Sequence, residues 1–100
     1  MLLANKLKNA IKREMPETNV EFVLHNVNIN GRKLGCSGFI ANKDNGMVMY
    51  VSTERIRPFG YMYRRAKSTS YYVGGYNRWA STEAELVKGI VEGLNGLISD

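Results

Sequence analysis

The chain has 100 residues, of which 44% are hydrophobic and 23% charged, and its formal net charge is +5. These values indicate one globular domain (1–100), and no apolar run approaches the roughly 20 residues of a membrane span or forms a signal-peptide core. A single Cys and a single His predict neither a disulfide nor a metal site, so a cytoplasmic protein without cofactors is expected.

The chain begins with a segment whose apolar residues have helical spacing. Residues 2–15 predict an amphipathic helix, because one face gathers Leu3, Ala4, Leu7, Ala10, Ile11 and Met15. Pro16 ends this helix, since its ring disfavours the α conformation at the preceding residue.

A β-hairpin follows. Residues 20–29 and 32–41 alternate as strands around Asn30-Gly31, the preferred pair for a type I′ turn. In a two-residue hairpin His25 lies opposite Cys36. The expected buried face then consists of Val23, His25, Val27, Ile29, Leu34, Cys36 and Ile40.

A second turn, Asp44-Asn45-Gly46, leads to a third strand at 47–53, with Val51 expected opposite Ile40. Residues 54–60 predict a loop, and 61–66 a fourth strand. Residues 67–79 predict a long, partly irregular connection of a kind that is often functional in a small domain.

The last predicted element is a helix over residues 83–98. Thr82 and Glu85 have capping-box spacing at its start. Gly89, Gly93 and Gly96 on one flank indicate either close approach to a neighbour or a loosely formed helix.

Together these elements predict an α+β fold. It has an N-terminal helix, a three- to four-stranded antiparallel meander sheet and a C-terminal helix, in the order α-β-β-β-(β)-α. Both helices are expected on one face, because only an apolar sheet face can bury their apolar stripes.

The charge and the aromatic residues concentrate in one segment. Between Arg55 and Thr82 there is no acidic residue, whereas the rest of the chain carries eight basic and nine acidic residues. Seven of the ten aromatic residues lie in the same segment. The candidate binding residues are Arg55, Arg57, Tyr61, Tyr63, Arg64, Arg65, Lys67, Tyr71, Tyr72, Tyr76, Arg78 and Trp79.

Arginine interleaved with aromatic rings is typical of a surface for single-stranded nucleic acid, because rings stack on bases and guanidinium groups bind phosphate. The same composition is typical of a protein-interface hot spot. A third interpretation is structural, with some Tyr in the core and the Arg solvated on strands.

The one candidate catalytic pair is His25 with Cys36, a combination that can form a thiolate nucleophile. Both positions fall on the expected core face, where a Cys behaves as a small hydrophobe. No third residue is evident to orient the imidazole. We therefore predict a structural Cys36, no catalytic residues and no enzyme activity.

Three stretches, HNVNINGRKLGCSGFI, MVMYVSTE and YRRAKSTSYYVGGYNRW, resemble small proteins borne by phages and conjugative elements of Gram-positive bacteria. The resemblance covers about residues 20–80 and implies a mobile-genetic-element setting inside a bacterial host. It implies no activity and no site.

The expected function is therefore that of a small binding protein of a mobile element, with nucleic acid bound through residues 55–79. The alternative is an anti-defence (anti-CRISPR-like) or host-factor inhibitor that acts by protein contact through the same surface. The expected partner is nucleic acid, an acidic host protein or a nucleoprotein, and no membrane. The oligomeric state is left open.

Overall fold

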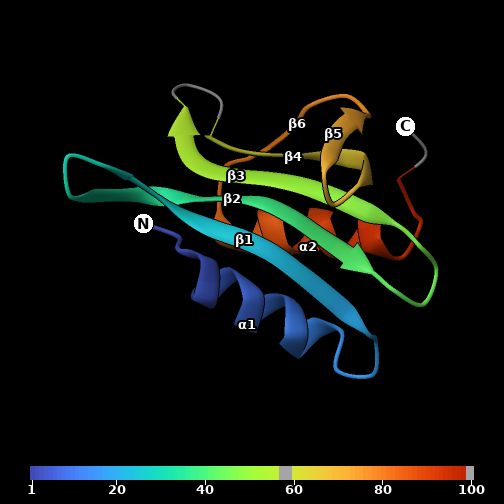
Figure 1. The fold of residues 1–100 in the computed structure, drawn as a ribbon. Helices are drawn as coiled ribbons and strands as arrows, with labels where there is room; N and C mark the ends of the chain where they lie inside the picture. The colour runs from blue at the N-terminus through green and yellow to red at the C-terminus, as the bar shows by residue number, and fades with distance from the viewer. Residues whose placement is uncertain (57–59, 99–100) are drawn as a thin grey trace.

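The computed structural model describes residues 1–56 and 60–98, and of residues 55, 56 and 71–74 only the backbone. The fold is the predicted α+β arrangement. In the chain, one helix precedes and one helix follows the strands of a single antiparallel sheet. Both helices cover the same face of the sheet, and no described element covers the other (Figure 1). In chain order the elements are α1 (Ala4–Glu14), β1 (Val20–Ile29), β2 (Arg32–Asn42), β3 (Val48–Ile56), β4 (Gly60–Ser68), β5 (Tyr71–Gly74), β6 (Arg78–Ala80) and α2 (Glu83–Leu94).

The sheet has six strands, more than the three or four expected. Its order is β1-β2-β3-β4-β5, and β6 also pairs with β4. Both short strands pair with the edge of β4 that is not paired with β3. β6 pairs with the first part of β4, and β5 pairs with its last part. The stretch 67–79 was predicted to be partly irregular, but much of it is strand, because pairing satisfies the backbone groups along that edge. Residues 54–60 were expected to form a loop. Residues 54–56 belong to β3 and Gly60 begins β4, and residues 57–59 lie outside the described part.

The β1–β2 turn has the predicted geometry, with positive φ angles at Asn30 (52°) and Gly31 (78°). The register next to the turn is also as predicted, since Asn28 lies opposite Lys33. Beyond that pair a β-bulge inserts Leu34 as an extra residue in β2, so that Val27 lies opposite Gly35. The bulge shifts the rest of the hairpin by one residue relative to the prediction.

This shift changes which side of β1 is buried. Phe22 and Leu24 pack against the core. In contrast, much of the face that was expected to be buried on this strand is exposed, with Val23 44% and Ile29 53% exposed. His25 lies opposite Ser37. The predicted pairing of His25 with Cys36 is therefore wrong, because a slip of one residue exchanges the two faces of a strand.

The β2–β3 connection also differs from the prediction. Ile40 lies opposite Met49 and not Val51, because the connection between the two strands spans residues 43–47 and is longer than a two-residue turn. The Gly46 N–H donates to the Asn42 carbonyl oxygen (2.8 Å) and closes this turn. The register error amounts to two residues, so the predicted face is kept, and Met49 and Val51 are buried beneath the helices.

The core lies between the sheet and the two helices. From α1 it receives Leu7 and Ile11, which confirms the predicted apolar stripe. The α2 helix begins with the predicted cap, in which the Glu85 N–H donates to Thr82 Oγ1 (3.1 Å). The buried residues of this core are Leu2, Leu7, Ile11, Met15, Cys36, Ile40, Met49, Val51, Tyr61, Ala80, Leu86, Ile90, Leu94 and Ile98.

The C-terminal end of α2 is fixed by the β2–β3 turn. The Leu94 carbonyl oxygen accepts hydrogen bonds from Nδ2 of Asn42 (2.7 Å) and of Asn45 (2.9 Å). These side chains satisfy an acceptor that the last helical turn leaves open. The helix therefore ends at Leu94, four residues before the predicted end.

Candidate functional site

The basic and aromatic segment 55–79 is divided between the two faces of the sheet. Along β4 the side chains alternate, so that Tyr61, Tyr63 and Arg65 point to the helix side, and Met62 and Arg64 to the opposite side. This alternation agrees with the prediction for an extended segment. It also means that the twelve candidate residues do not form one continuous surface.

Two of the candidate tyrosines are part of the packed interior. Tyr61 is 7% exposed and belongs to the core. Tyr63 is half-buried under α2, where its ring fills the space beside Gly89. Burial raises the pKa of the Tyr63 phenol, and the positive charge of Arg78 partly opposes this rise. Both tyrosines therefore match the structural interpretation of the segment.

The other candidates lie at several places. Arg65 and Arg78 are half-buried on the helix side, and Lys67 is exposed at the end of β4. Tyr76 is 78% exposed in the connection between β5 and β6. Arg57 lies outside the described residues. Only the backbone is described for Arg55 in β3 and for Tyr71 and Tyr72 in β5.

The sheet face opposite the helices, called here the helix-free face, collects the remaining candidates. Directly paired residues of antiparallel strands share a face, so the register assigns two neighbouring rows to it. One row crosses β1 to β4 as Val23, Phe39, Tyr50 and Arg64. The next row crosses β1 to β6 as His25, Ser37, Ser52, Met62 and Trp79.

Aromatic side chains dominate the middle of the helix-free face. The rings of Phe39 and Tyr50 meet edge to face, with centroids 5.2 Å apart. They pack on a small apolar cluster formed by Ala41, Val48 and Ala66. This cluster holds the two rings in place, so the surface they present is organised before any ligand binds.

Two residues of the predicted segment join these rings. Trp79 is 39% exposed in the neighbouring row. Arg64 lies beside Tyr50 in the same row, and its Nη1 donates to Asn77 Oδ1 (2.9 Å). This hydrogen bond fixes the guanidinium group to the connection between β5 and β6 and restricts its conformations.

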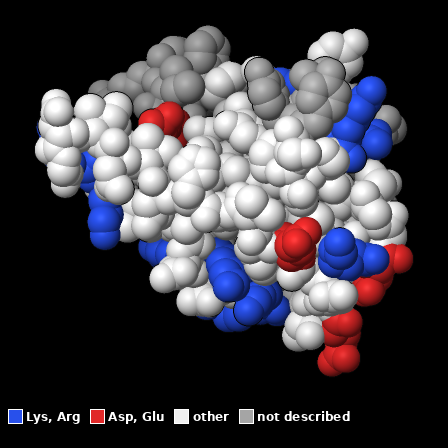
Figure 2. Space-filling view, viewed as in Figure 1, with Lys and Arg blue, Asp and Glu red and all other residues white. Residues whose placement is uncertain are grey.

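Charge is distributed around this surface rather than across it. On the side of the molecule shown in Figure 2, charged side chains gather along the border, and the middle over β1 to β3 is largely uncharged. Among the residues of the two rows on the helix-free face, Arg64 carries a positive charge. Arg32 extends this side at the β1–β2 turn, because it is paired with Ile29.

Phe39 and Tyr50 were not among the predicted site residues, because they lie outside the basic segment. A signal for them exists in the sequence. Tyr50 alternates with Met49 and Val51, which are buried on the helix side, so period-two alternation already assigns Tyr50 to the other face. Phe39 neighbours the buried Ile40 in the same way.

Cys36 has the structural surroundings predicted for it. The residue is fully buried, and burial raises the pKa of its thiol, with a smaller opposing effect from the Thr53 hydroxyl. His25 lies on the opposite face, where its Nε2 is 3.1 Å from Ser37 Oγ. The two side chains of the candidate dyad are therefore separated by the sheet.

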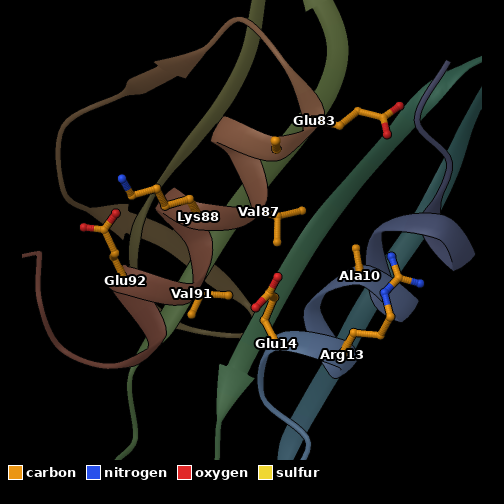
Figure 3. Close-up of a pocket in the computed structure, with 9 residues that line it drawn as sticks. Ala10, Arg13, Glu14, Glu83, Val87, Lys88, Val91 and Glu92 are labelled. Atoms are coloured by element: carbon orange, nitrogen blue, oxygen red, sulfur yellow. The ribbon is translucent and has the colours of Figure 1, made fainter.

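A groove of about 550 Å³ lies between α1 and α2 (Figure 3). Ala10, Val87 and Val91 form apolar parts of its lining, and charged side chains of both signs surround them. The lining holds Glu14, Glu83 and Glu92 together with Arg13 and Lys88, so its charge is mixed.

Comparison of the chain with protein-family models, curated proteins and solved structures finds no match. Within residues 1–56 and 60–98, no group of three or more His, Cys, Asp or Glu side chains comes together. In the same residues, neither helix has the length and apolar character needed to cross a membrane.

Proposed function

We propose that the protein binds single-stranded nucleic acid on the helix-free face of its sheet. The observation that carries this proposal is the group of Phe39, Tyr50 and Trp79 on that face, next to the hydrogen-bonded guanidinium of Arg64. Aromatic rings on an uncovered sheet provide stacking partners for bases, each worth about 1–3 kcal/mol.

Single strands fit this surface better than duplexes do. Stacking requires bases that are not already paired and stacked, so rings on this face favour single strands. Rings interact with the π-face of every base. We therefore expect binding with little sequence preference.

The charge of the protein supports this choice of ligand. A net charge of +5 attracts a polyanion over the whole molecule, and Arg64 supplies a local phosphate contact beside the rings. Arg32 adds a positive charge on the same side at the β1–β2 turn, where it is paired with Ile29. A few phosphate contacts predict a moderate dependence of affinity on salt.

Neighbouring arginines provide a matched test. Fluorescence anisotropy with a labelled oligothymidylate of about ten nucleotides would measure affinity at several salt concentrations. Arg64→Ala, on the helix-free face, should weaken binding and lower the salt slope by about 0.7 to 1. Arg65→Ala, on the helix side, should leave both quantities unchanged. Equal effects of the two substitutions would contradict the assignment of the face.

The alternative function, contact with a host protein through the same face, is an outcome of this experiment. In the mobile-element setting that the sequence resemblance implies, such a partner would be a defence or replication factor. The exposed Val23 beside Phe39 gives that alternative its support. Absence of oligonucleotide binding at about 50 mM salt would favour it, because buried aromatic contacts between proteins depend less on salt.

A further inference from the structure

The first strand of the sheet leaves one of its edges open. β1 is ten residues long and pairs with β2 alone among the described strands. Its outer edge therefore presents a row of backbone N–H and C=O groups. Such a row is a template for a further strand.

Natural proteins usually protect long edge strands with lysine, proline or a bulge. β1 has the sequence VEFVLHNVNI, which contains neither lysine nor proline. Glu21 is its single acidic residue, and the bulge of the hairpin lies in β2. In a chain with 14 basic residues, the absence of lysine from this strand leaves the edge open to pairing.

The two sides of this edge differ in chemistry. On the helix-free side lie three apolar residues, Val23 (44% exposed), Val27 and Ile29 (53% exposed), with Glu21 and His25 alternating among them on the same side. A strand added here would therefore meet apolar side chains on this side. Each apolar residue that it placed there would extend the uncharged surface of the sheet.

On the helix side, basic residues of α1 lie near β1. The Lys8 ammonium lies 5.7 Å from the centroid of the Phe22 ring of β1. Lys12 is exposed one helical turn later on the same flank. In Figure 2 basic side chains gather below β1, where Figure 1 draws α1.

Two carboxylates beside α1, those of Glu14 and Glu83, are on its other flank. Arg13 and Glu14 line the groove toward α2, and Lys6 forms an ion pair with Glu83 of α2 (3.2 Å). Lys8 and Lys12 therefore face the strand edge without a described carboxylate of α1 on their flank.

We propose that β1 binds an extended segment of a partner protein as an added strand, with apolar and acidic residues in alternation. The apolar residues of that segment lie beside Val23 and Val27, and its carboxylates face Lys8 and Lys12. Charge complementarity selects this partner over a second copy of the chain. Pairing of two β1 edges would bring two lysine-bearing flanks of α1 side by side.

A direct test uses a synthetic peptide of ten residues, the length of β1, in which Val and Glu alternate. Nuclear magnetic resonance of the labelled protein should show shifts confined to β1 and the facing flank of α1, and slower amide exchange along β1. A peptide that alternates Val and Lys should bind at least about tenfold more weakly. Equal binding of both peptides, or shifts centred on another element, would overturn the proposal.

Two double substitutions on α1, each of which removes two positive charges, test whether the flank with Lys8 and Lys12 contributes to binding. Lys8→Gln with Lys12→Gln should weaken binding of the Val/Glu peptide about fivefold. Lys6→Gln with Arg13→Gln, on the flank toward α2, should leave it unchanged. The opposite order would contradict the proposal. Oligothymidylate binding to the same variants provides a separate readout, since the helix-free face and the β1 edge are tested by different ligands.

Discussion

At the scale of single residues, Thr53 connects three parts of the molecule. Its Oγ1 accepts a hydrogen bond from the Cys36 N–H (2.8 Å) and donates to the Leu2 carbonyl oxygen (2.6 Å). All three residues are buried. A buried hydroxyl with both partners satisfied stabilises the fold, because its hydrogen-bonding capacity is used inside the protein. The residues before α1 are thereby fixed to β3 and β2.

The thiol beside this hydroxyl predicts a loss of stability at alkaline pH. Burial raises the pKa of Cys36 in the folded protein, so the folded state holds its proton at pH values where the unfolded chain, with a pKa of about 8.5, releases it. The stabilisation is present below that pH and is lost as the pH rises toward the folded pKa.

Guanidinium unfolding with reductant at increasing pH measures this effect. Between about pH 8.5 and 9.5, the free energy of unfolding should fall more for the parent than for Cys36→Ala, by at most about 1.4 kcal/mol per pH unit. Native protein should also react slowly with a thiol reagent at neutral pH. Parallel pH profiles of the two proteins, or fast labelling, would show that the thiol is not buried.

At the scale of elements, the contact between α2 and the sheet depends on two glycines. A methyl group added at Gly89 would lie 2.6 Å from Oη of Tyr63, and one added at Gly93 would lie 2.6 Å from Cε of Met49. Of the two interpretations of the glycine spacing, close approach to a neighbour is therefore confirmed at these two positions. Gly96 lies beyond the end of α2.

The two glycines should respond differently to alanine. Alanine gains about 1 kcal/mol of helix propensity at either site. At Gly89 the rigid ring of Tyr63 cannot move easily, and overpacking costs about 1–3 kcal/mol, so Gly89→Ala should lower the melting temperature. At Gly93 the flexible Met49 can adapt, so Gly93→Ala should change it little. A melting temperature raised by Gly89→Ala would refute this packing.

The β1–β2 turn permits a second test at this scale. Gly31 has a φ of 78°, and nothing lies within 4 Å of an added Cβ, so a substitution there is sensitive to backbone strain alone. Gly31→Val should destabilise the fold by about 1–2 kcal/mol. Gly31→Asn should cost less, since Asn tolerates this conformation. Thermal melts would compare the two, and equal melting temperatures would contradict a left-handed turn residue.

Much of the fold could be predicted from local signals. The apolar stripe of α1, the Thr82 cap of α2 and the Asn30-Gly31 turn all act within a few residues of sequence. The bulge at Leu34 could not, because no turn or spacing signal in the sequence marks it. A Cβ at Gly35 would lie 2.8 Å from Oγ1 of Thr53, and no local pattern announces that approach.

At the scale of the whole molecule, strand pairing explains why the site was only partly predictable. Composition identified Arg64 and Trp79, which lie on the helix-free face, but it grouped them with Tyr61 and Tyr63, which pack under the helices. Phe39 and Tyr50 join the surface through strand pairing. Sequence composition counts residues along the chain, whereas a sheet face collects every second residue of several strands.

The proposal that nucleic acid binds on the helix-free face can be tested through Trp79. This residue is the single tryptophan of the chain and is partly exposed on that face. The measurement is its fluorescence during titration with an oligothymidylate of about ten nucleotides, at about 50 and about 200 mM salt. Stacking of bases on this face predicts saturable quenching with an affinity that falls at the higher salt concentration. Unchanged emission, with the oligonucleotide shown by anisotropy to be bound, would contradict the proposal that the helix-free face is the binding surface.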